Sequence, residues 1–119
     1  MFLSIDGIDG VGKSTQIELL RNWLEGQGRE VVSCRDPGST QLGEEIRAIL
    51  LGEHDTPVAM RSEMLLYMAA RAQLVEEVIR PALESNRTVL CDRYLLANVV
   101  YQGYGGGLDV EELWTVGRI

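Results

Sequence analysis

An apolar run, a glycine loop and the start of a helix follow one another without a gap near the beginning of the chain. Residues 2–15 read Phe-Leu-Ser-Ile-Asp-Gly-Ile-Asp-Gly-Val-Gly-Lys-Ser-Thr, and the stretch from Gly7 to Ser14 fills the pattern G-x-x-x-x-G-K-[ST] without a mismatch. Glycines let successive backbone N–H groups point inward at phosphate oxygens, and the following helix directs the positive end of its dipole to the same place. Lys13 adds a mobile positive charge, and the Ser14 hydroxyl suits a Mg²⁺ ligand. The stretch therefore predicts a phosphate-binding loop, in preference to a glycine-rich turn that binds nothing.

Strands and helices alternate along the rest of the chain. Apolar and β-branched runs predict two further strands, over residues 30–34 and 87–92. Apolar residues at helical spacing predict helices over 15–25, 42–50, about 58–84 and 95–102. Residues 103–107 are expected to form a flexible loop, and a last helix follows it. Pro81 should kink or restart the long helix, and Asp109 with Glu112 should form a capping box for the last one. Strands separated by helices require a parallel sheet with right-handed crossovers, so we expect an α/β fold in a single domain over residues 1–119.

Charged residues follow each predicted strand at its carboxyl end. Loop 7–14 follows the first strand, Arg35 to Gly38 follow the second, and Asp92-Arg93-Tyr94 follow the third. Taken singly, Arg35 could be a surface charge, and Asp92 with Arg93 could cap the next helix. Because ligands gather at the carboxyl ends of parallel strands, we expect these residues near the phosphate loop, where two arginines suit the charge of a transferring phosphoryl group.

Charge and hydropathy exclude several classes of protein. The sequence has 11 Lys and Arg against 18 Asp and Glu, a net charge of −7 without a basic run, which disfavours a nucleic-acid partner. No stretch is long enough to span a membrane, and residues 1–15 do not resemble a signal peptide, so we expect a cytoplasmic protein. Cys34 and Cys91 each end a predicted buried strand, which favours core residues over a disulfide or a metal pair. His54 is expected in a solvated loop.

Several motifs in this order resemble those of the thymidylate kinases, a family of the nucleoside monophosphate kinase type. They are Gly7-Ile8-Asp9-Gly10-Val11-Gly12-Lys13-Ser14-Thr15, Arg35-Asp36-Pro37-Gly38, Glu44-Glu45-Ile46-Arg47, Tyr67-Met68-Ala69-Ala70-Arg71, Asp92-Arg93-Tyr94 and Tyr101-Gln102-Gly103. The resemblance covers essentially the whole chain. It implies a P-loop NTPase fold, transfer of the γ-phosphoryl of ATP to dTMP with Mg²⁺ to give dTDP and ADP in dTTP biosynthesis, and a homodimer in the complete enzyme. Another deoxynucleotide or nucleoside kinase, or a non-catalytic nucleotide-binding fragment, remains as an alternative.

The resemblance also implies a role for individual residues. The ATP phosphates would be held by Gly7, Ile8, Asp9, Gly10, Val11, Gly12, Lys13, Ser14 and Thr15. The catalytic residues would be Asp9, Lys13, Arg35, Asp92 and Arg93, with Ser14 and Asp92 at the metal. The residues that bind dTMP would be Arg35, Arg47, Tyr67, Arg71, Arg93, Asn98, Tyr101 and Gln102. Spacing alone favours a core aromatic for Tyr67, which stands where the family usually has a phenylalanine stacked on thymine, and it leaves open that Arg47 is a solvated helix arginine.

Two departures from the family pattern stand out. Some members carry an arginine inside the phosphate loop, whereas this chain has Val11 there, so the resemblance places a catalytic arginine in a later lid segment. The chain stops at Ile119, within or just after a helix, where the family continues through the lid and further strands. With only three strands predicted, one side of the first strand would have no partner. We therefore expect the chain to correspond to the amino-terminal part of such a kinase, with the fold incomplete at the carboxyl end.

Overall fold

The computed structural model describes residues 1–7, 12–52, 56–94, 103 and 105–118. Its elements are β1 (Phe2–Ile5), α1 (Lys13–Gly26), β2 (Val31–Arg35), α2 (Gln41–Leu51), α3 (Met60–Leu74), η1 (Val75–Ile79), α4 (Arg80–Glu84), β3 (Thr88–Asp92) and α6 (Val110–Gly117). The predicted helix over 95–102 and His54 lie outside the described residues. No described helix is long and apolar enough to cross a lipid bilayer.

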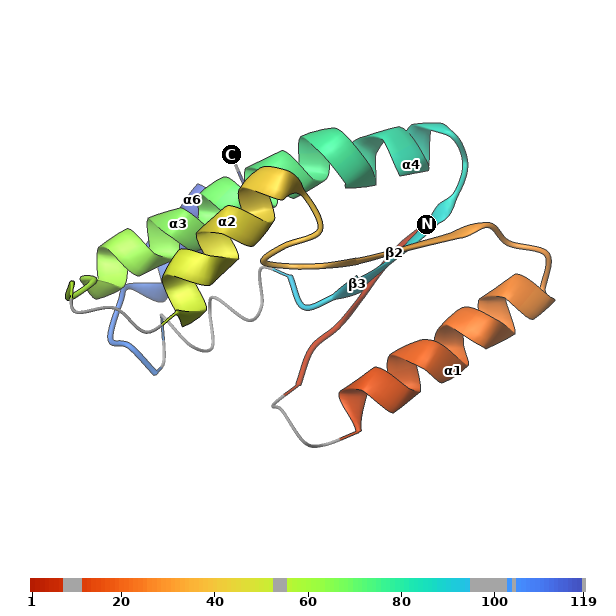
Figure 1. Ribbon diagram of the computed structural model, residues 1–119, viewed down its shortest axis with the longest axis horizontal. Helices are drawn as coiled ribbons and strands as arrows, with labels where there is room; N and C mark the ends of the chain where they lie inside the picture. The colour runs from red at the N-terminus through yellow and green to blue at the C-terminus, as the bar shows by residue number, and fades with distance from the viewer. Residues whose placement is uncertain (8–11, 53–55, 95–102, 104, 119) are drawn as a thin grey trace.

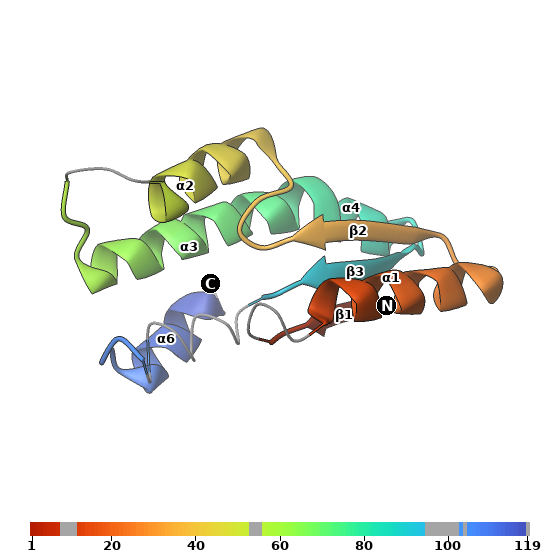
Figure 2. The same ribbon diagram turned by 60° about the horizontal axis from the view of Figure 1, so that its bottom comes forward.

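A parallel sheet forms the centre of the fold. Its strand order is β1-β3-β2, so β3 pairs with both neighbours and β1 lies at an edge. Helix α1 lies on one face of the sheet, and η1 and α4 lie on the other (Figures 1 and 2). The α/β class and the parallel sheet are therefore confirmed. The unpartnered side of the first strand, expected from the sequence, is also found among the described residues.

The core between the sheet and the long helical segment is built from apolar residues of both. Its buried members are Cys34, Leu74, Ile79, Ala82, Val89 and Cys91. Cys34 and Cys91 are opposite each other on β2 and β3, and both are buried free thiols, which confirms their interpretation as core residues. A second cluster joins α3 to α6 through Met64 and Leu113, beyond the end of the sheet.

The long helical segment changes its hydrogen-bonding pattern before Pro81. It is α-helical to Leu74, π-helical over Val75–Ile79, and α-helical again from Arg80. Proline lacks the N–H that an α-helix needs at this position, and a π-helical turn accommodates the mismatch. The prediction that the helix is interrupted near Pro81 is confirmed.

Two side chains cap the starts of helices α2 and α6. The Thr40 hydroxyl accepts from the Gly43 N–H at 2.8 Å and caps α2. The Asp109 carboxylate accepts from the Glu112 N–H at 2.9 Å and caps α6, which confirms the Asp109 half of the predicted capping box.

Candidate active site

The carboxyl ends of all three strands meet at one edge of the sheet. Asp92 is opposite Ile5 on one side and Arg35 on the other. Backbone hydrogen bonds continue this pairing one residue beyond the strands. The Arg93 N–H donates to the Ile5 carbonyl at 3.0 Å, and the Asp36 N–H donates to the Asp92 carbonyl at 3.0 Å. The ends of β1, β2 and β3 therefore lie side by side, as expected from the order of strands and helices (Figure 1).

Lys13, which follows the glycine loop, lies at this edge of the sheet. Gly12 has φ 85, a left-handed conformation that glycine adopts without steric cost, and α1 begins at the next residue. The Lys13 ammonium lies 2.5 Å from the Asp92 carboxylate. The first turn of α1 has no side-chain cap and no acidic residue, so nothing on the helix itself opposes an anion at this end. Ser14 and Thr15 lie exposed in that turn, whereas Ile8, Asp9, Gly10 and Val11 lie outside the described residues.

The chemistry of Ser14 and Asp92 fits the Mg²⁺ ion that the sequence resemblance implies. Magnesium is usually held by one or two carboxylates together with waters and substrate phosphates, and not by a cage of protein ligands. Asp92 is a carboxylate one third exposed beside the loop lysine. The described residues contain no group of three or more His, Cys, Asp or Glu side chains that could hold a metal, which is compatible with such a shared site.

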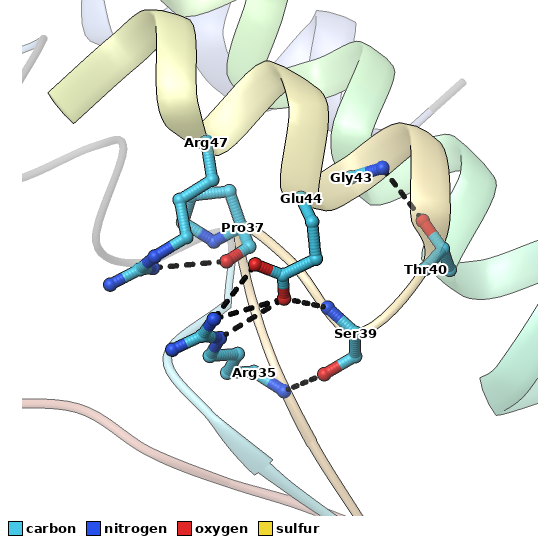
Figure 3. Close-up of polar contacts among 7 residues, drawn as sticks. All are labelled: Arg35, Pro37, Ser39, Thr40, Gly43, Glu44 and Arg47. Atoms are coloured by element: carbon cyan, nitrogen blue, oxygen red, sulfur yellow. Dashed lines mark hydrogen bonds and ion pairs between the residues drawn. The ribbon is translucent and has the colours of Figure 1, made fainter. Parts of the chain in front are cut away.

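The segment after β2 is folded around Glu44 (Figure 3). The guanidinium of Arg35 donates to both oxygens of Glu44, with Nη2 at 2.8 Å from Oε2 and 3.0 Å from Oε1. The Ser39 N–H donates to Oε1 at 2.9 Å, and the Arg35 N–H donates to the Ser39 hydroxyl at 2.8 Å. Hydrogen bonds from Arg35 and then from Ser39 hold the pKa of the Glu44 carboxyl below its usual value. Because Arg35 and Glu44 are about half exposed, their contact orients Arg35 without burying it.

Gly38 lies close to this ion pair. It has φ +134, and a Cβ added to it would come within 2.6 Å of Glu44 Oε1 and 2.9 Å of Arg35 Nε. We expect Gly38→Ala to lower the free energy of unfolding by about 1–3 kcal/mol, measured by urea denaturation, because strain and a steric clash coincide. Gly28→Ala is the matched control, since Gly28 has φ +83 and nothing within 4 Å of its added Cβ. An equal loss in both variants would contradict the role of the clash.

Arg47 and Tyr67 approach the same region from α2 and α3. Arg47 Nη1 donates to the Pro37 carbonyl at 3.1 Å, so this arginine is anchored to the segment after β2 and is only partly exposed. Tyr67 is half-buried, and burial raises the pKa of its hydroxyl, as does Glu63, whereas the nearby charges of Arg93 and Arg47 lower it. The charges of Arg47 and Arg93 are therefore both close enough to Tyr67 to affect its hydroxyl.

Arg71 and Arg93 also lie at this edge. Arg71 is 5% exposed, and its Nε donates to Asp36 Oδ2 at 2.5 Å. Arg93 is partly buried and has φ 70, a left-handed backbone conformation that costs a residue with a side chain about 1–3 kcal/mol and is found mainly where a site holds a residue in place. Asn98, Tyr101 and Gln102 lie outside the described residues. The ligand assigned to each of these residues stays a prediction.

Three neighbours of the predicted site residues belong to the quoted sequence motifs but were given no role there. Glu44 orients Arg35, Asp36 pairs with Arg71, and the Tyr94 ring lies against the Arg71 guanidinium. Asp36 and Tyr94 each come within two residues of a strand end, at the edge where the sequence already predicts a site. That position was the available signal, but it does not indicate which arginine each one contacts.

A family model, curated relatives and a solved structure match the chain, and each of these matches is to thymidylate kinases. The family model described as "Thymidylate kinase" matches residues 5–118. The thymidylate kinase of Rhodopirellula baltica is 50% identical over 117 residues, which are 98% of this chain and 47% of the relative, and that of Kosmotoga olearia is 51% identical over 98% of this chain and 55% of the relative. The crystal structure of thymidylate kinase from Ehrlichia chaffeensis superposes with a TM-score of 0.90 at 35% identity, covering 99% of this chain and 67% of that one.

These matches define both the family and the extent of the likeness. The chain spans about half the length of the curated relatives it matches. The superposition confirms the P-loop fold of the nucleoside monophosphate kinase type that the sequence implies. The chain therefore belongs to the thymidylate kinase family.

Proposed function

We propose that this chain binds the phosphates of ATP together with dTMP, and that it takes part in transfer of the γ-phosphoryl group from ATP to dTMP. The observation that carries the proposal is the contact of Lys13 with Asp92 at the edge where Arg35 and Arg93 leave their strands. A phosphate loop with a lysine, flanked by two arginines, suits the charge that develops on a transferring phosphoryl group. We also propose a homodimer, a cytoplasmic location and no nucleic-acid partner, as the resemblance and the charge of −7 suggest.

On the donor side, Gly7 to Thr15 would bind the ATP phosphates. Backbone N–H groups of the first turn of α1 face that position, and Lys13 Nζ would move from Asp92 to phosphate oxygens. Ser14 and Asp92 would hold Mg²⁺, which when bound neutralises phosphate charge. Asp9 would face the acceptor sugar or the metal.

On the acceptor side, Arg35 and Arg93 would bind the phosphate of dTMP and turn it toward the donor. An oxygen of that phosphate forms a bond to the γ-phosphorus, while the bond from the γ-phosphorus to the β–γ bridging oxygen breaks and its electron pair leaves with ADP. Tyr67 would stack on thymine, and Arg71 would donate to the base edge. Arg47 would lie beside the acceptor, while Asn98, Tyr101 and Gln102 would complete the base and sugar pocket.

Nucleotide binding by the chain tests the proposal. We expect calorimetry to show dTMP binding with a dissociation constant of roughly 1 µM to 1 mM, the usual range for enzyme substrates. The matched control is dCMP, which carries an amino group where thymine carries a carbonyl. We expect it to bind at least about tenfold more weakly, because an unpaired buried donor costs about 1–3 kcal/mol.

The reaction itself is tested in a fusion of residues 1–119 to the remaining half of the Rhodopirellula relative. We expect formation of ADP that depends on dTMP. Absence of dTMP binding, or equal binding of dCMP, would overturn the acceptor assignment and favour another nucleotide kinase. Nucleotide binding without turnover in the fusion would favour a non-catalytic fragment.

A further inference from the structure

A carboxylate with almost no solvent access is paired with Arg71. The side chain of Asp36 is 0% exposed and that of Arg71 is 6% exposed, and Nε of Arg71 lies 2.5 Å from Oδ2 of Asp36. The two residues are 35 positions apart in the sequence, and they join the end of β2 to the middle of the long helix. Burying two charges costs free energy that their attraction repays only when the geometry is good.

Other groups hold the same guanidinium in place. The ring of Tyr94 lies against it, with 4.9 Å from Cζ to the ring centroid, and Nη1 contacts the sulfur of Met68 at 3.2 Å. Tyr94 is itself fixed, since its ring packs edge-on against Phe2 at 5.0 Å. Residues that follow β2 and β3 thus hold Arg71 from two directions, in addition to its own helix.

Asp36 is poorly suited to a purely structural role. Its second oxygen, Oδ1, is buried, and none of the described residues donates a hydrogen bond to it. Burial raises the pKa of this carboxyl, and the charge of Arg71 offsets only part of that effect. Apolar residues in place of a buried ion pair are often neutral or stabilising, so stability alone does not explain a charge here.

We propose that Asp36 is a positioning residue for base recognition, which acts by fixing the guanidinium of Arg71 against the ring of Tyr94. The inference rests on the proposed function, in which Arg71 donates to the base of dTMP. The side chain of arginine is long and has several freely rotating torsions. An arginine that is already oriented therefore loses less conformational freedom when the nucleotide binds. Asp36 therefore contributes to affinity for dTMP without touching it.

The test is calorimetric titration of the chain and its variants with dTMP and, separately, with ATP. We expect Asp36→Asn to weaken dTMP binding about tenfold, equivalent to about 1.4 kcal/mol, and to leave ATP binding within about twofold. Arg71→Lys, which keeps the charge but not the planar fork, should weaken dTMP binding as well. In the double variant, Asp36→Asn should add almost nothing to the effect of Arg71→Lys, because Asp36 acts through Arg71.

A control, a second variant and a second measurement separate this role from loss of folding. Glu76→Gln makes the same chemical change in the exposed pair of Glu76 with Arg80, and we expect dTMP binding to stay unchanged. The NMR signal of the Arg71 Nε–H should be protected from exchange with water in the unmodified chain and lose that protection in Asp36→Asn. Tyr94→Leu removes the ring face and should weaken dTMP binding in the same selective way, which tests the arrangement should Asp36→Asn fail to fold.

The outcomes distinguish this inference from the proposed function. Full dTMP affinity in Asp36→Asn, together with a loss in Arg71→Lys, would overturn the inference and leave the proposed function standing. An equal loss of ATP binding, or additive losses in the double variant, would show a structural role for Asp36 and likewise overturn it. Absence of dTMP binding by the unmodified chain, or full affinity in Arg71→Lys, would overturn the base contact of the proposed function and the inference with it.

Discussion

Replacing Lys13 by methionine should lower phosphoryl transfer by roughly 10²–10³ in the fusion with the remaining half of the Rhodopirellula relative. This is the loss observed when one preorganised donor to a developing charge is removed. Lys13 is the first residue of α1, partly buried at the edge where the three strands end, and its ammonium already lies 2.5 Å from Asp92. Methionine keeps the length and the apolar stem of the side chain, so the fold should remain intact. A coupled assay for ADP formation gives the rate, and far-UV circular dichroism checks the fold.

A second cation on the same helix provides the control for this experiment. Arg21 is about half exposed and contacts Glu25 and Ser33, away from the glycine loop. We expect Arg21→Met to retain turnover within about twofold, because surface ion pairs contribute little. Turnover like that of the unmodified fusion in Lys13→Met would remove Lys13 from the mechanism. An equal fall in both variants would indicate a general effect of charge on α1.

The local elements of the fold were predictable because their signals are local. The run that ends in Cys34 is bounded by Gly28 and Pro37, and Thr40 and Asp109 each accept a hydrogen bond from the third residue that follows. The position of β3 between β1 and β2 was not predicted. That order depends on which strands pair over long sequence separations, and short apolar runs carry little information about such pairing.

The site was predictable to the level of segments but not of side-chain contacts. The rule that parallel strands present ligand-binding residues at their carboxyl ends was enough to bring Lys13, Arg35 and Asp92 together. It could not show that Asp36 turns inward to Arg71 while Arg35, one residue earlier, turns outward to Glu44. Successive residues at a strand end point in opposite directions, and the packing of distant helices decides which partner each one meets.

The unpaired side of β1 leads to a prediction about the chain when it is expressed alone. Strand β1 pairs on one side with β3, and among the described residues its other side has no strand beside it. Its sequence, Phe-Leu-Ser-Ile, contains no charge. Strand β2 forms the opposite edge, but it ends in Arg35, and Arg21 of α1 contacts its Ser33 at 2.9 Å. Charged side chains along an edge discourage pairing with another chain, so β1 is the edge at which we expect association.

Residues 1–119 expressed alone should therefore self-associate and should form no ADP in response to dTMP above background. Phosphoryl transfer requires charge neutralisation on both sides of the transferring group. The chain spans about half the length of its curated relatives, and the resemblance places a catalytic arginine in a later lid segment. Electrostatic contacts to phosphates are weaker where water reaches them. Sedimentation velocity measures the association, and a coupled assay measures ADP.

A charge placed on each edge strand in turn identifies the edge responsible. Ser4 is exposed in the middle of β1, and Ser4→Lys should shift the chain toward the monomer, because lysine on an edge strand opposes pairing. Ser33→Lys makes the same change on β2 and should leave the distribution unchanged. A shift in Ser33→Lys alone would assign the association to β2. Robust turnover that depends on dTMP, from a monodisperse monomer of the unmodified chain, would contradict both parts of the prediction. It would mean that residues 1–119 form a working catalytic site on their own and do not associate through β1.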